Sequence, residues 1–257
     1  MLKGRLMIVV FLALLLLSAC REQTTDITWT EVDVPSFDWF QAAGITEEQA
    51  TGITGQTDID LSKLRFDINA DPEYQYSQMA WLDENTLFCV KTKRDYLQSE
   101  GTALAAFTLD GEETILELNP SKSLVTQVRG NAVAYMPCYE MVFQDGITFS
   151  VWDSESKTLN PVYHFQDGYV IASQQFFSPD GTKAAFAWTS NLPALTWRIR
   201  MVDMATGDVW DLDPPQWDTN AESKILFSYW IDNNTLSVTE SDGLTAEANC
   251  ISWTCTL

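Results

Sequence analysis

The stretch Phe176–Trp188, FFSPDGTKAAFAW, decides how the rest of the chain is interpreted. Pro179-Asp180-Gly181 is a turn signal, because proline presets one turn dihedral, aspartate bonds to nearby backbone, and glycine accepts the left-handed conformation. Apolar residues flank this turn, so the pattern predicts a strand, a tight turn and a second strand. Asp180 and Gly181 are therefore predicted to be turn formers, and Asp180 is not expected to be catalytic.

Three other stretches repeat this pattern more weakly. They are MAWLDENTLFCV (79–90), VRGNAVAYM (128–136) and SYWIDNNTLSV (228–238). Their predicted turns contain Asp83, Gly130 and Asp232. With Gly181 these turns recur about every fifty residues, which is typical of a repeat architecture.

A second hairpin follows the first in three of the repeats. An alternating strand runs into Asp110, Asp153 or Asp203, a short turn follows, and another apolar segment leaves it. Two hairpins in each repeat predict a four-stranded antiparallel unit, the blade of a β-propeller. The predicted fold class is all-β, a small propeller-like domain of about four or five such blades. A generic antiparallel sandwich remains the alternative.

The turn Ser178-Pro179-Asp180-Gly181, followed by Ala184-Ala185-Phe186, resembles the TolB-type propeller repeat. In that repeat an SPDG turn links the two inner strands of a blade. The resemblance implies blades at approximately 74–119, 124–165, 170–213 and 224–257. Because the last blade lacks a fourth strand, we expect residues 62–69, which alternate in polarity, to pair with its edge and close the ring.

The chain begins with the pattern of an exported protein. Lys3 and Arg5 precede an uninterrupted apolar run over residues 6–17. This run is too short to span a bilayer as a helix and is typical of a signal peptide.

The run ends in LSAC (17–20), which resembles the lipobox of bacterial lipoproteins. The resemblance implies cleavage before Cys20 and a lipid on its thiol. The protein would then be anchored on the extracytoplasmic side of a membrane in the bacterial cell envelope. Residues 1–19 are the predicted signal peptide, residues 20–60 a tether and N-terminal segment, and residues 61–257 the propeller-like domain.

The charge of the chain excludes one class of partner. Thirty-six acidic residues face fifteen basic ones, a formal net charge of −21. Such a charge repels phosphate backbones, so nucleic-acid binding is not expected. The membrane is expected to be contacted only through the lipid on Cys20.

Four further cysteines permit two disulfides in an exported protein: Cys89, Cys138, Cys250 and Cys255. On one extended strand Cys250 and Cys255 would lie roughly 16 Å apart, beyond the reach of a disulfide. A disulfide between them therefore needs a turn in the chain between them. Otherwise each pairs with another cysteine or stays free. No cysteine and histidine cluster suggests zinc, and no metal or cofactor is predicted.

Catalytic motifs are not found. The single histidine, His164, has no nucleophile motif nearby and is expected to be a surface or blade-edge residue. Trp29, Trp39 and Trp217 lie outside the repeat frame and are the candidates for a binding surface.

The predicted function is a non-catalytic binding module or scaffold for a protein or glycan partner. The alternatives are a glycan-active enzyme with paired carboxylates and a structural or sensory component of an envelope complex.

Overall fold

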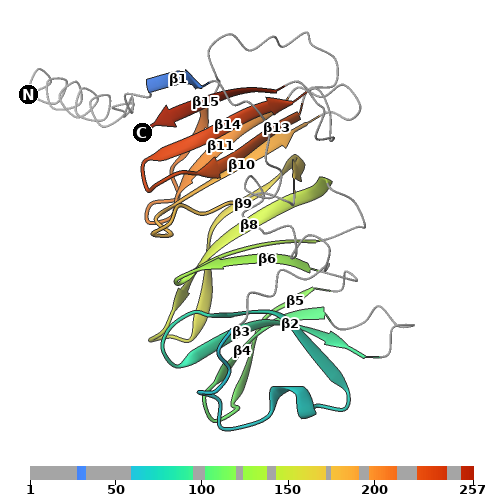
Figure 1. Ribbon diagram of the computed structural model, residues 1–257. Coiled ribbons are helices and arrows are strands. Elements are labelled where there is room, and N and C mark those ends of the chain that lie inside the picture. The colour runs from blue at the N-terminus through green and yellow to red at the C-terminus, as the bar shows by residue number, and fades with distance from the viewer. Residues whose placement is uncertain are drawn as a thin grey trace, which may run out of the picture.

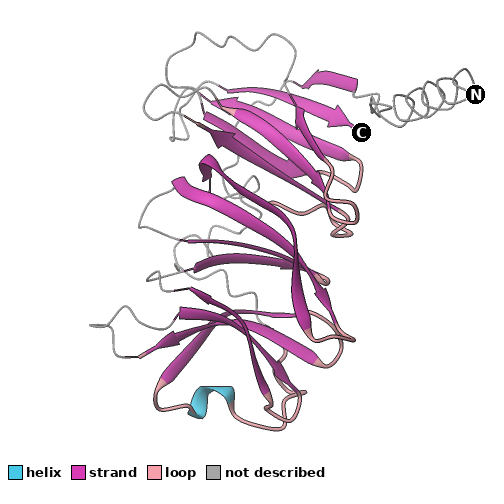
Figure 2. Cartoon of the chain, turned by 180° about the vertical axis from the view of Figure 1, so that it is seen from behind, coloured by secondary structure: helices cyan, strands magenta, loops and turns pink. Residues whose placement is uncertain are grey.

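The computed structural model describes residues 28–32, 59–94, 102–119, 124–137, 143–171, 175–190, 197–212, 225–241 and 250–257. Throughout this part of the chain the structure is all-β apart from one short 3-10 helix (Figures 1 and 2). The strands form three antiparallel sheets of four, seven and four strands. Within these residues no helix has the length and apolar character needed to cross a bilayer.

The first sheet is a meander in which each strand pairs with the next along the chain. Its strands are β2 (Tyr74–Trp81), β3 (Thr86–Lys93), β4 (Thr102–Thr108) and β5 (Glu113–Asn119), in that order. β4 has the sequence TALAAFT and is buried at every position except the last. A run of small and apolar residues suits this strand, because hydrophobic cores lie on both of its faces.

The middle sheet joins the second and third repeats. Its strands lie side by side in chain order: β6 (Leu124–Arg129), β7 (Ala132–Pro137), β8 (Phe143–Asp153), β9 (Thr158–Ile171), β10 (Lys183–Thr189), β11 (Arg198–Asp203) and β12 (Val209–Leu212). β9 pairs with β8 along its length and also with β10, where Val170 lies opposite Trp188.

The expectation of separate four-stranded blades is therefore wrong for these two repeats. Gly168 allows β9 to approach β10 closely, because a Cβ at this position would lie 2.3 Å from the carbonyl oxygen of Thr189. The continuous β9 makes one seven-stranded sheet out of two repeats.

The last sheet is completed by a strand from near the N-terminus. It contains β13 (Ile225–Trp230), β14 (Thr235–Ser241) and β15 (Cys250–Thr256), and β1 (Thr28–Val32) pairs with β15. Thr28 lies opposite Thr256, and Val32 lies opposite Ser252. The added strand covers an edge that would otherwise be open to other chains.

The prediction that residues 62–69 supply this strand is wrong. These residues contain turns and the start of the 3-10 helix η1 (Ile68–Ala70). They lie only a few residues before β2, so the short link keeps them at the first sheet. There Phe66 packs on Phe107 with ring centroids 5.6 Å apart, and the apolar residues cover the outer face of the first sheet.

One hydrogen bond recurs in the tight turns: an aspartate carboxylate accepts a hydrogen bond from the backbone N–H two residues later. It occurs in five turns: Asp83 accepts from Asn85 at 2.8 Å, Asp153 from Glu155 at 2.9 Å, Asp180 from Thr182 at 3.0 Å, Asp203 from Ala205 at 2.8 Å and Asp232 from Asn234 at 2.8 Å. Gly130 and Gly181 have φ of +57° and +73°, the left-handed region that favours glycine.

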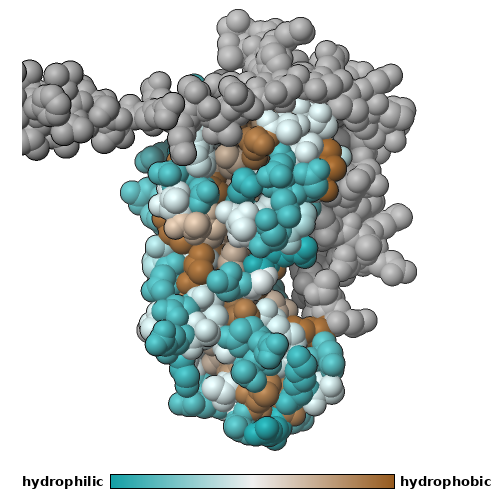
Figure 3. Space-filling view, turned by 90° about the vertical axis from the view of Figure 1, so that its left-hand side faces the viewer, coloured by the Kyte–Doolittle hydropathy of each residue, from teal (hydrophilic) through white to brown (hydrophobic). Residues whose placement is uncertain are grey.

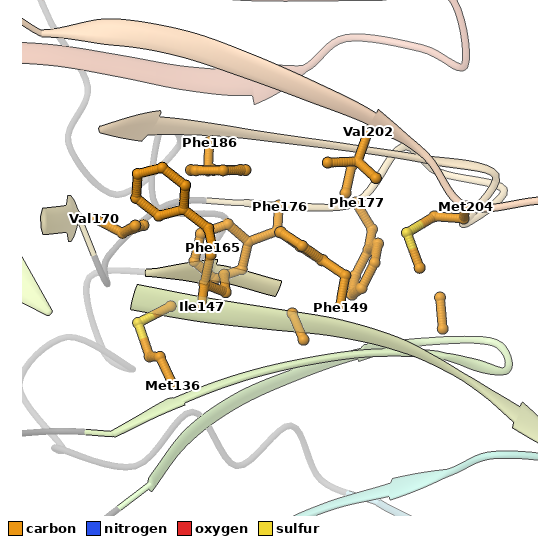
Figure 4. Packing of buried hydrophobic residues seen from close by; sticks show 13 residues of the cluster. Met136, Ile147, Phe149, Phe165, Val170, Phe176, Phe177, Phe186, Val202 and Met204 are labelled. Atoms are coloured by element: carbon orange, nitrogen blue, oxygen red, sulfur yellow. The ribbon is translucent and has the colours of Figure 1, made fainter. Parts of the chain in front are cut away.

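The hydrophobic core lies between the sheets and inside the curved middle sheet. Figure 4 shows one part of this core, where three aromatic rings pack around Phe149. Its ring centroid is 6.0 Å from that of Phe176, 5.8 Å from that of Phe177 and 5.6 Å from that of Phe186. The two phenylalanines before the SPDG turn thus form part of the core of the middle sheet.

Hydrogen bonds link equivalent parts of successive repeats. Gln127 Oε1 accepts the backbone N–H of Phe176 at 2.7 Å, and Trp230 Nε1 donates to the carbonyl oxygen of Phe176 at 2.9 Å. Arg129 Nε donates to the carbonyl oxygen of Pro179 at 2.6 Å. Each repeat is therefore tied to the next one, as in a propeller.

The described sheets do not close into a ring. The first and last sheets lie at opposite ends of the molecule, with the middle sheet between them (Figure 1). The fold is thus propeller-like in its repeated antiparallel units and open in its overall arrangement.

Candidate functional site

The residues predicted to form turns lie in turns. Asp83, Asp180 and Asp232 each accept hydrogen bonds within their own turn, Gly130 follows the end of β6, and Gly181 lies just before β10. Burial acts to raise the pKa of Asp180, but hydrogen bonds from Thr182 and Ser178 outweigh it and hold the pKa below its usual value.

The predicted aromatic binding surface is largely outside the described residues. This applies to Trp39, Trp217 and the predicted lipidation site Cys20. Trp29 lies on β1 opposite Cys255, and only its backbone is described. The three tryptophans therefore stay a prediction.

Two of the four cysteines that permit disulfides are free in the structure. Cys89 and Cys255 are buried free thiols. Burial raises the pKa of the Cys255 thiol to about 11, so this thiol is protonated and unreactive at neutral pH. Cys250 lies on the same strand as Cys255, and Cys138 lies outside the described residues.

His164 is an exposed residue of β9, as expected for a strand surface. Its Nδ1 lies 2.8 Å from the hydroxyl oxygen of Thr148 on the neighbouring strand. Within the described ranges no group of histidine, cysteine, aspartate and glutamate could hold a metal ion.

A groove between the first and middle sheets is the candidate functional site. It has a volume of about 570 Å³ and lies where three turns meet: β2–β3, β4–β5 and β8–β9. Its charged lining consists of Asp83, Glu84, Asp110, Glu112, Arg65 and Lys157, and its apolar lining includes Phe107, Leu109 and Trp152. Figure 3 looks onto the side that carries many of the tight turns, which is mostly hydrophilic.

Trp152 and Asp83 join the two walls of the groove. The indole N–H of Trp152 donates to Asp83 Oδ2 at 2.8 Å, from the middle sheet to the first. Burial acts to raise the pKa of Asp83, but the N–H groups of Asn85 and Trp152 outweigh it and hold the pKa below its usual value. Asp83 is therefore ionised at neutral pH and serves as a structural acceptor.

Two other carboxylates of the groove make weak ion pairs. Arg65 lies 2.7 Å from Asp110, and each side chain is 69% exposed. Lys157 lies 3.6 Å from Glu112, and both are also largely exposed. Ion pairs in such positions contribute roughly 0–1 kcal/mol, so an incoming cation can replace them at little cost.

Glu84 differs from the aspartates of the other turns. It is exposed and makes no ion pair with any described residue. By contrast, Asp153, Asp180, Asp203 and Asp232 are held by N–H groups of their own turns. Three carboxylates with weak ion pairs or none, Glu84, Asp110 and Glu112, therefore lie in one groove.

Sequence patterns did not point to this groove. Asp110 and Asp153 were recognised only as turn markers, and Glu84 is one of thirty-six acidic residues. The groove exists because Trp152 reaches Asp83 across 69 residues of chain. No local signal encodes that contact.

No family model and no curated protein matches the sequence. Similar solved structures include one from a study of two prolyl endopeptidases, with 20% identity and a TM-score of 0.48 over 70% of this chain and 28% of that chain. Tricorn protease shares 11% identity at a TM-score of 0.44, over 72% of this chain and 17% of its own. TolB from Acinetobacter baumannii shares 11% identity at a TM-score of 0.33, over 67% and 41%. The chain spans less than half of each.

These similarities overturn one expectation. The sequence-based prediction was a non-catalytic protein, but two of the three structures are peptidases. The prediction that the chain is not an enzyme is therefore withdrawn. None of the three is described as glycan-active, so the alternative of a glycan-active enzyme gains no support.

Proposed function

We propose that the protein is a lipid-anchored component of the bacterial cell envelope that binds a basic segment of a partner protein in the groove between its first and middle sheets. The observation that carries the proposal is the concentration of uncommitted carboxylates in that groove. Glu84 has no ion pair with a described residue, and Asp110 and Glu112 have only exposed, weak ones. Lysine or arginine side chains of a partner complete these ion pairs.

The overall charge of the protein supports a cationic partner. The formal net charge is −21, so a basic segment is attracted from a distance and an acidic one is repelled. The groove is open and lies where three turns meet, which suits a peptide segment better than an enclosed small molecule.

The groove is poorly suited to a glycan. Sugar rings stack on exposed aromatic faces, but Trp152 and Phe107 are each only 5% exposed. Both rings are buried in hydrophobic clusters and offer little surface for stacking. A protein segment is therefore the occupant that the described lining favours.

The anchor leaves the groove accessible. Thr28 lies eight positions after Cys20, a separation of at most roughly 28 Å when this segment is fully extended. β1 belongs to the last sheet, at the end of the molecule opposite the first sheet (Figure 1). A lipid on Cys20 would thus hold the last sheet near the membrane, with the first sheet at the far end of the molecule.

Reversing the charge of Glu84 tests the groove. The full chain is purified in detergent, and fluorescence anisotropy measures its binding of a fluorescein-labelled peptide of alternating lysine and alanine. Glu84→Lys is expected to weaken binding roughly thirtyfold, because it replaces an attraction by a repulsion of about 1 kcal/mol each at close range.

Asp167→Lys is the matched control, because Asp167 is exposed on β9, does not line the groove, and its reversal changes the net charge equally. This variant should bind within about twofold of the unmodified protein at moderate salt. Equal losses in the two variants would mean that only net charge matters, and the groove proposal would then be abandoned.

The proposed anchor has its own test. Cys20→Ala removes the thiol that accepts the lipid and is expected to shift the protein from the membrane fraction to the soluble fraction of cell lysates. Metabolic labelling with a fatty acid should be lost in parallel. Continued membrane association without label would show that another element holds the protein there.

A further inference from the structure

A second hollow adjoins the groove at the outer end of the first sheet. It has a volume of about 490 Å³ and is formed by the chain segment that covers this sheet. Its lining includes Leu61, Leu64, Arg65, Phe66, Ile68 and Asn69. Leu61, Leu64 and Phe66 are only half-buried, so apolar surface is accessible in the hollow.

The walls of the hollow are held in place by hydrogen bonds. Leu64 N–H donates to the carbonyl oxygen of Leu61 at 3.0 Å. Arg65 N–H donates to the carbonyl oxygen of Leu109 at 2.9 Å, in the β4–β5 turn of the groove. Asp67 accepts the N–H of Asn69 at 2.9 Å. The hollow is therefore already formed and needs no ordering when a ligand enters.

The hollow and the groove share one side chain. Arg65 lines both of them, and it pairs with Asp110 on the groove side. An extended segment advances about 7 Å in two residues, which is enough to pass from one side of Arg65 to the other. One peptide segment can thus occupy both sites.

We propose that the hollow receives an apolar side chain of the same partner segment whose basic residues enter the groove. The partner motif is then an apolar residue about two positions from lysine or arginine, in an extended conformation. This inference rests on the proposed function, since it extends the same site. The apolar contact supplies a preference among basic segments that charge alone does not provide.

Two peptides separate the two proposals. The first is the labelled peptide of alternating lysine and alanine, and the second has one central alanine replaced by leucine. Half-burying a leucine side chain corresponds to roughly fivefold tighter binding, so the leucine peptide should bind the unmodified protein by about that factor more tightly.

Substitutions in the hollow should remove this gain. Asn69→Phe fills the hollow from an exposed position, and Leu64→Ser removes an apolar side chain from its wall. Each variant should bind the leucine peptide no more tightly than the lysine-alanine peptide. Asn131→Phe, which adds a ring on the exposed β6–β7 turn, is the control and should keep the gain. Thermal unfolding checks that Leu64→Ser is folded. If Leu64→Ser is unfolded, the result with Asn69→Phe alone tests the hollow.

The outcomes distinguish failure of either proposal. If the leucine peptide binds no more tightly, or if its gain survives Asn69→Phe, the hollow is not an apolar subsite, even when the lysine peptide binds and responds to Glu84→Lys. If the lysine-alanine peptide does not bind, or if Glu84→Lys does not weaken its binding, the groove proposal fails. The inference about the hollow then fails as well.

Discussion

Replacing Trp152 with alanine is expected to lower the free energy of unfolding by about 3–5 kcal/mol, the usual cost of truncating a large buried aromatic side chain. Trp152 is 5% exposed and packs in the cluster between the first and middle sheets. The substitution also leaves Asp83 Oδ2 without its indole donor. Both the core and the joint between the groove walls are therefore damaged by one change.

Urea denaturation followed by tryptophan fluorescence measures this loss. Trp152→Phe keeps most of the apolar contact and removes the N–H, so it should cost roughly 1–3 kcal/mol, the range for a lost hydrogen bond to a charged partner. If Trp152→Ala and Trp152→Phe are equally destabilising, the packing contribution has been overestimated. If neither lowers the free energy of unfolding, the two sheets are not joined through this residue.

Gly146→Ala is expected to destabilise the middle sheet by roughly 3 kcal/mol, because strain and a steric clash act together. Gly146 has φ of +84°, and a Cβ there would lie 2.6 Å from the carbonyl oxygen of Phe165. It lies where the register of β8 and β9 shifts, between Asp145 and Ile147. Neither strand can move easily, since Ile147 and Phe165 are each 1% exposed in the core.

Gly130→Ala separates the two causes. Gly130 also has positive φ, +57°, but a Cβ there would meet nothing within 4 Å. This variant should lose only roughly 1 kcal/mol, the cost of the left-handed conformation. Thermal unfolding of both variants checks the difference. Similar losses would show that backbone strain dominates and that β8 and β9 adjust to the added methyl group.

The hairpins could be predicted because their information is local. The turn at Asp180-Gly181 combines a carboxylate that accepts the N–H of Thr182 with a glycine in the left-handed region. The same aspartate signal at Asp83 and Asp232 identified two weaker copies. Neighbouring residues alone create these interactions, so they are readable in a single sequence.

The arrangement of the hairpins could not be predicted in the same way. Alternation in residues 62–69 is compatible with a strand, but their apolar side chains cover the first sheet, and β1 pairs with β15 instead. Likewise, nothing in the sequence of β9 indicates that this strand pairs with both β8 and β10. Edge pairing depends on which backbone groups remain open after the sheets have packed, and that is a property of the whole fold.

The sequence by itself determined the all-β class, the recurrence of paired strands and the aspartate turns, because these follow from residue type and spacing over a few positions. Only the tertiary structure decided which strand completes the last sheet and which of the many carboxylates stand together. Glu84, Asp110 and Glu112 lie on two separate turns, and the contact of Trp152 with Asp83 closes the wall beside them. Electrostatic attraction depends on distance in space, so the candidate site appears only once the chain has folded.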